Sequence, residues 1–234
     1  MSAFGDAVTW INDPVNWRGR FGVPHLLLEH LAISGVAVGA ACVVAWPVAI
    51  WLGHLGRAGL LTSSLSTVSR AVPTLALLTI FAATPIGFGD RATMVALAVF
   101  AIPPLLTNAY VGMREVDRDV VEAARGMGLS SWQVVRKVEV PLALPLIAAG
   151  FRTAAVQVVA TASLAALVAG GGLGVIVNDG FGRQRPGQIL AGAVLIALLA
   201  VITEVALAGV QRAVTPGRQQ TRTIRRTVLR RRVP

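Results

Sequence analysis

Apolar residues form long runs along this chain, and polar residues gather in the short stretches between them. The run at 31–52 holds no ionisable side chain over 22 residues. As an α-helix it would be about 33 Å long, enough to cross a hydrocarbon core of roughly 30 Å. Comparable runs predict an all-α polytopic membrane protein with five transmembrane helices, near 31–53, 59–86, 92–113, 142–168 and 188–211.

Composition supports this class. Only 14% of the residues are charged, whereas soluble domains average roughly 25%. Residues 1–20 lack a basic region followed by an apolar run, so we expect no cleaved signal peptide and a first span that stays as an anchor. The single cysteine, Cys42, excludes a disulfide within the chain.

The net charge of +10 is concentrated after the last apolar run. Such a tail could bind nucleic acid, but directly beside a membrane helix we interpret it as a cytosolic anchor next to anionic lipid. With 114–141 and the tail in the cytosol, fourteen Arg and Lys lie on that side and five on the other. We therefore predict an extracytoplasmic N-terminal segment at 1–30, a membrane domain at 31–211 and a basic cytoplasmic tail at 212–234, in the cell membrane.

The polar segment 114–141 predicts two short helices joined by a glycine corner. Asp117 is a typical N-cap for the first helix, with acids in the first turns. Val120, Ala124 and Met127 fall on one face of this helix, and glycines follow it. Ser130 and Gln133 have the spacing of a capping box that starts the second helix, and Pro141 is expected to stop it.

This segment resembles the cytoplasmic loop of binding-protein-dependent ABC importer permeases. Their pattern is Glu-Ala-Ala, three residues, Gly, nine residues, an aliphatic, one residue, then an aliphatic and Pro. The matching positions here are Glu122-Ala123-Ala124, Gly128, Val138 and Val140-Pro141.

The resemblance implies a type I ABC importer permease-like fold in which this loop is a coupling helix seated on a separate ATPase. It implies that Glu122 and Gly128 shape the contact and that Ala123 and Ala124 allow close approach. The implied partners are an ABC ATPase, an extracellular or periplasmic substrate-binding protein, and a second permease copy or a sister permease. ATP would be bound by the ATPase, which leaves this chain with no cofactor and no catalytic role.

Further positions resemble one branch of that family, the importers of glycine betaine, choline, carnitine or proline. They are 69–78 (SRAVPTLALL), Pro103-Pro104 with Asn108 and Gly112, and 170–174 (GGGLG). Arg70 departs from the Gln more usual in that branch.

Arg152 lies inside the fourth predicted span and Glu204 inside the fifth. Such residues are functional candidates, but we expect these two to form an ion pair that holds the helices together. His25, His30 and His54 flank the first span without carboxylates at ligand spacing, so we expect interfacial residues and no metal site.

Other classes of protein fit less well. The stretch 182–187 lacks the Gly-Lys-Ser/Thr end of a Walker loop, so ATP hydrolysis by that route is excluded. A membrane enzyme would need acids or histidines clustered at one membrane face. An ion-gradient-driven carrier of small amines, with Glu204 as its ion-linked residue, is the alternative that stays open.

Overall fold

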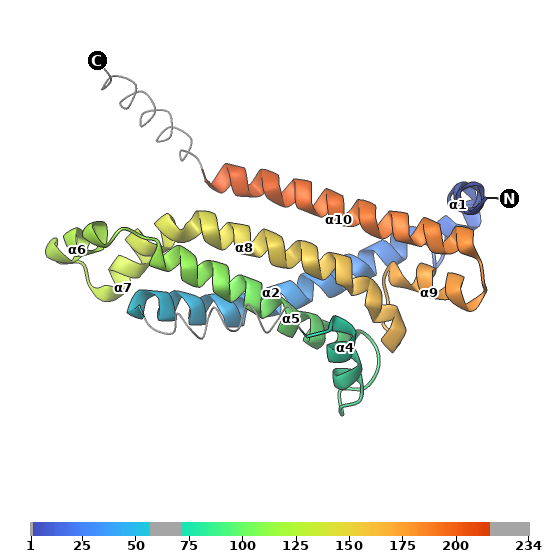
Figure 1. The fold of residues 1–234 in the computed structure, drawn as a ribbon, viewed down its shortest axis with the longest axis horizontal. Helices are drawn as coiled ribbons and strands as arrows, with labels where there is room; N and C mark the ends of the chain where they lie inside the picture. The colour runs from blue at the N-terminus through green and yellow to red at the C-terminus, as the bar shows by residue number, and fades with distance from the viewer. Residues whose placement is uncertain (1, 57–71, 216–234) are drawn as a thin grey trace, which may run out of the picture.

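The computed structural model describes residues 2–56 and 72–215, and every regular element within these ranges is a helix. Four helical stretches are long and apolar enough to cross a membrane: Val23–Leu55, Asp90–Arg114, Ser131–Val168 and Pro186–Val214. They run side by side along the long axis of the molecule (Figure 1). The elements in chain order are α1 (Ala3–Asn12), η1 (Pro14–Trp17), α2 (Val23–Leu55), α4 (Thr74–Ala82), α5 (Asp90–Arg114), α6 (Arg118–Gly126), α7 (Ser131–Val134), η2 (Val135–Glu139), α8 (Val140–Thr161), η3 (Ala162–Val168), α9 (Gly174–Gly182) and α10 (Pro186–Val214).

Four of the five predicted spans have counterparts among the described residues. Within the remaining prediction, 59–86, residues 59–71 with Arg70 lie outside the described part, as does most of the basic tail, and the described portion contains the nine-residue helix α4. The first span begins at Val23 rather than at 31. The connection between the fourth and fifth predicted spans contains helix α9.

Helices α2 and α5 run in the same direction. Near one end, a Cβ on Gly53 of α2 would lie 2.5 Å from Met113 Cβ of α5. At the other end, Glu29 of α2 and Asp90 of α5 accept hydrogen bonds from adjacent backbone N–H groups of the same glycine loop. The last residue of α2, Leu55, and the first residue of α5, Asp90, therefore lie at opposite ends of the bundle.

Small side chains allow the helices to pack closely, as is usual in membrane bundles. On α2, an alanine every fourth residue forms a stripe that is at most 1% exposed, made of Ala37, Ala41, Ala45 and Ala49. Between α5 and α8, Gly150 approaches Asn108 so closely that a Cβ would lie 2.5 Å from Asn108 Cβ. Asn108 in turn donates its side-chain amide to the Pro104 carbonyl at 2.8 Å.

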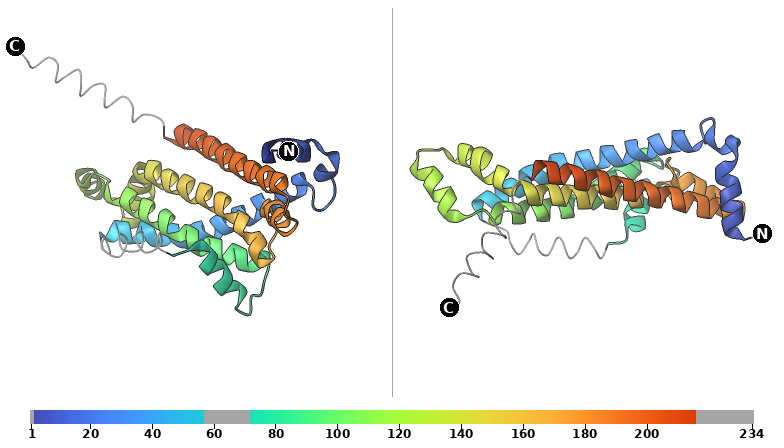
Figure 2. Two further views of the ribbon diagram at one scale, coloured as in Figure 1. Left: turned by 45° about the vertical axis from the view of Figure 1, so that its right-hand side comes forward. Right: turned by 90° about the horizontal axis from the view of Figure 1, so that it is seen from above.

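The two ends of the bundle carry different elements. Helices α6 and α7 lie at one end, and α1 and α9 at the other (Figures 1 and 2). Helix α1 crosses the end of the bundle, and its backbone at Asp6 approaches Gly187 of α10, where a Cβ would lie 2.7 Å from the Asp6 carbonyl carbon. The C-terminal end of α2 lies at the α6–α7 end, and α10 ends over the first turns of α8 on the same side.

Candidate functional site

The segment 114–141, which we call the docking loop, forms two capped helices as predicted. The Asp117 side chain accepts a hydrogen bond from the Asp119 backbone N–H and caps α6. Ser130 and Gln133 form a reciprocal capping box at the start of α7. Between them Gly128 has φ +85°, a left-handed conformation that costs little only for glycine. These local interactions give the loop a defined shape.

Helix α6 packs against the bundle through one face. Val121 and Ala124 are the buried residues, each 2% exposed, and they join the main apolar core. Of the three residues predicted to share one face of this helix, Ala124 is buried, whereas Val120 and Met127 are 44% and 76% exposed. The periodicity alone allowed either face, and the packing of α6 on the valines that follow Gln133 decided between them.

The remaining residues suggested by the loop pattern also divide between surface and interior. Glu122, Ala123 and Gly128 are exposed, and so is Pro141, whereas Val138 is half-buried. Ala124 faces inward, so among the two alanines only Ala123 is available to a partner. Trp132 is 68% exposed and, with Val120 and Met127, gives the outside of the loop three large apolar side chains.

Pro141 does not stop the second helix, contrary to the prediction. The backbone passes from α7 through a π-helical turn, Val135–Glu139, directly into α8. In this turn Val140 N–H donates to the Val135 carbonyl, five residues back. Because proline has no N–H to donate, a local change to π register lets the helix continue through Pro141.

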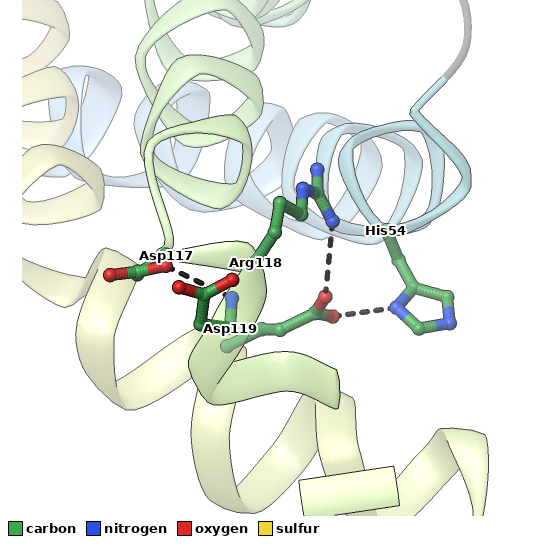
Figure 3. A network of polar contacts seen from close by, with 5 residues as sticks. His54, Asp117, Arg118 and Asp119 are labelled. Carbon is green, nitrogen blue, oxygen red and sulfur yellow. Dashed lines mark hydrogen bonds and ion pairs between the residues drawn. The ribbon is translucent and has the colours of Figure 1, made fainter. Parts of the chain in front are cut away.

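The π-helical turn directs Glu139 into the protein, where its side chain is 0% exposed. Its carboxylate Oε2 accepts a hydrogen bond from His54 Nδ1 on the last turn of α2 at 2.6 Å. Its other oxygen, Oε1, lies 4.0 Å from Arg118 Nη1 at the start of α6 (Figure 3). His54 was expected at the membrane interface, but its side chain is only 8% exposed.

Arg152 and Glu204 also come together. Arg152 Nε lies 3.2 Å from Glu204 Oε1, linking α8 to α10. Arg152 Nη1 donates to Gln211 Oε1 at 2.8 Å, so the arginine contacts α10 twice. Both charged side chains remain more than a third exposed, so the pair lies at the surface of the bundle.

The glycine loop that follows η3 is held at the opposite end of the bundle. The backbone N–H groups of Gly171 and Gly172 donate to Asp90 and Glu29, at 2.8 and 3.2 Å. The next N–H, of Leu173, donates to His30 Nδ1, whose other ring nitrogen is 2.8 Å from the Val159 carbonyl. His30 is therefore a fully buried structural residue, not an interfacial one.

Across residues 2–56 and 72–215, no three His, Cys, Asp or Glu side chains gather as a metal site would require. The sequence pattern pointed to the surface of the docking loop and to the Arg152–Glu204 pair, but not to Glu139 with its partners. The signal in the sequence was one acidic residue between valines just before an apolar run, and its partner His54 lies 85 residues away along the chain.

Four membrane-length helices with a structured polar loop at one end define a polytopic membrane protein. Over residues 43–218 the chain matches the family described as "Binding-protein-dependent transport system inner membrane component". The chain belongs to this family: it is the membrane permease subunit of a binding-protein-dependent ABC importer, and a partner ATPase handles the ATP.

Individual relatives and a solved structure agree with this family. The chain is 35% identical to the glycine betaine/carnitine/choline transport system permease protein OpuCB of Bacillus subtilis (strain 168), over 80% of this chain and 86% of that protein. It is 37% identical to the carnitine transport permease protein OpuCB of Listeria monocytogenes, again over 80% and 86%. An inward-facing structure of the MetNI methionine ABC transporter superposes with a TM-score of 0.72 at 25% identity, over 87% of this chain and 99% of that one.

Proposed function

We propose that this permease subunit forms the membrane passage for a quaternary amine or related osmoprotectant: glycine betaine, choline, carnitine or proline. The observation that carries the proposal is the similarity, at 35% and 37% identity over 80% of the chain, to permeases named for betaine, carnitine and choline. A separate binding protein delivers the solute, and the described spans expose few polar side chains that could bind it tightly on their own.

Transport assays on the reconstituted importer test the substrate. Proteoliposomes holding the permease, its ATPase and its binding protein are given radiolabelled glycine betaine, with unlabelled choline, carnitine, proline or methionine as competitors. The amines and proline are expected to compete, and methionine is not. Uptake blocked by methionine and indifferent to every amine would refute the proposed substrate class.

The docking loop is the proposed contact with the ATPase. It combines a defined backbone with exposed apolar side chains at Val120, Met127 and Trp132. Exposed apolar groups on a rigid element are typical of protein interfaces. Glu122, Ala123 and Gly128 lie on its accessible part, with Val138 and Pro141 at the base where the loop enters α8.

Charge reversal in this loop tests the contact. Glu122→Arg is expected to reduce co-purification of the ATPase and ATP-dependent uptake together. Asp13→Arg, an exposed charge reversal at the opposite end of the bundle, is the matched control and is expected to leave co-purification unchanged. A Glu122→Arg permease that retains the ATPase and imports normally would contradict the docking role.

The proposed orientation places the N-terminus outside and the C-terminus in the cytosol. It is supported by the excess of Arg and Lys on the docking-loop side and by the C-terminal end of α10, which lies over the first turns of α8 on that side of the bundle. Trp132→Cys in a Cys42→Ala background tests it: an impermeant thiol reagent should label this cysteine in inside-out vesicles only. The dimer partner, a second copy or a sister permease, would complete the passage.

A further inference from the structure

Three separate elements meet at the carboxylate of Glu139. His54 lies on the last turn of α2, Arg118 is the first residue of α6, and Glu139 itself ends the π-helical turn that leads into α8. One buried acid thus contacts a membrane helix, the docking loop and the start of a second membrane helix (Figure 3).

The two contacts of this carboxylate differ in quality. The bond to His54 Nδ1 is short, at 2.6 Å, slightly below the ~2.7–2.9 Å of charge-assisted N–H···O hydrogen bonds. The approach of Arg118 Nη1 to Oε1, at 4.0 Å, is longer than the ~2.7–3.2 Å of an N–H···O hydrogen bond. Glu139 is therefore hydrogen-bonded to α2 but not to α6; we call the 4.0 Å approach to Arg118 the open contact.

Polar atoms on both sides of the open contact are unpaired. Glu139 Oε1 and Arg118 Nη2 are each enclosed by protein and have no hydrogen-bond partner among the described residues. Leaving a buried charged group unsatisfied is costly, so a conformation that brings the Arg118 guanidinium onto Glu139 Oε1 would be favoured electrostatically. A movement of about 1 Å at the start of α6 would bring Arg118 Nη1 from 4.0 Å to hydrogen-bonding distance of Oε1.

We propose that Glu139 is a positioning residue that transmits displacement of α6 to α2 and α8 during transport. The inference rests on the proposed docking of this loop on the ATPase. When the ATPase moves α6, Arg118 closes on Glu139, and the carboxylate passes the displacement to α2 through His54. The π-helical turn is part of the device because it directs Glu139 inward while the helix continues past Pro141.

The test compares transport with ATP hydrolysis in the reconstituted importer, using radiolabelled glycine betaine. Glu139→Gln keeps the side-chain shape and removes the charge. We expect betaine imported per ATP hydrolysed to fall at least about fivefold, the lower end of typical coupling between sites. The amount of ATPase that co-purifies should stay at the wild-type level, and Asp13→Asn, an acid-to-amide change at the far end, should leave the ratio unchanged.

Arg118→Gln carries the same test if Glu139→Gln fails to assemble, because the Arg118 side chain is 41% exposed and lies at the edge of the cluster. It is expected to lower the ratio by a similar factor. A wild-type ratio in the assembled variant would overturn the inference.

A crosslink from Trp132→Cys to the ATPase separates this failure from failure of the docking proposal. A crosslink that persists in Glu139→Gln while the ratio is normal would overturn the positioning role alone. No crosslink in an otherwise wild-type importer would overturn the docking proposal and this inference with it.

Discussion

Arg152 and Glu204 join α8 to α10 through a 3.2 Å contact between Arg152 Nε and Glu204 Oε1. The pair offers a structural explanation for two ionisable residues inside apolar helices, where an unpaired charge would be costly. The pairing with Arg152 also accounts for Glu204 without the ion-linked role of a gradient-driven carrier.

Alanine substitutions at these two positions should not be additive. Arg152→Ala and Glu204→Ala are each expected to lower thermal stability, and the double variant should lose less than the two losses summed, by roughly 0.5–3 kcal/mol of coupling. The measurement is a double-mutant cycle by thermal unfolding in detergent. Arg152→Ala combined with Asp13→Ala, a distant site, is the additive control. Full additivity for Arg152 and Glu204 would refute the pairing.

Gly53 permits the close packing of α2 on α5. A methyl group there would lie 2.5 Å from Met113 Cβ, so Gly53→Ala should destabilise the bundle by about 1–3 kcal/mol through overpacking. Gly35 on the same helix has open space around it, and Gly35→Ala should be neutral or mildly stabilising because alanine favours helix. Equal melting temperatures for the two variants would contradict this assignment.

Gly128 supplies the left-handed corner of the docking loop. Gly128→Ala forces a side chain into φ +85°, a strain of roughly 1–2 kcal/mol. We expect faster proteolysis of the loop and weaker ATPase co-purification. Gly126→Ala, within α6 and facing open space, is the matched control and should leave both unchanged. Indistinguishable loops in the two variants would show that the corner tolerates a side chain.

Asp179 on α9 should make stability depend on acid. The hydrogen bond from the Gln188 side-chain amide, aided by Arg183 and Arg185, lowers the pKa of this carboxyl below its ordinary value of 3.8. The folded state therefore prefers the ionised form, and its contribution is present above pH 3.8 and is lost as pH falls through the lower folded-state pKa.

Thermal melts from pH 6 downward check this sign. The wild type should lose more stability than Asp179→Asn as the carboxyl becomes protonated, so the two curves should converge at the acid end. A variant whose melting temperature falls in parallel with the wild type over the whole range would argue against a role for Asp179.

Local features of the site could be predicted from sequence because they depend on neighbours along the chain. Asp117 and the Ser130–Gln133 box cap their helices through contacts within three residues. The described membrane spans could also be predicted from sequence, because the length and hydropathy of an apolar run decide whether it crosses a membrane. Elsewhere several conformations satisfied the same local pattern. The spacing of Val120, Ala124 and Met127 does not say which side of α6 packs on the bundle, and Pro141 commonly ends a helix but does not end this one.

By itself, therefore, the sequence determined the membrane class, the described spans, the capped loop and the family pattern centred on Glu122 and Gly128. Only the tertiary structure decided which face of α6 meets the bundle and that the helix continues through Pro141. It alone brought His54 to Glu139 across 85 residues of chain. The physical reason is range: hydrophobicity and capping act over a few residues, whereas the partner of a buried charge depends on how whole helices pack.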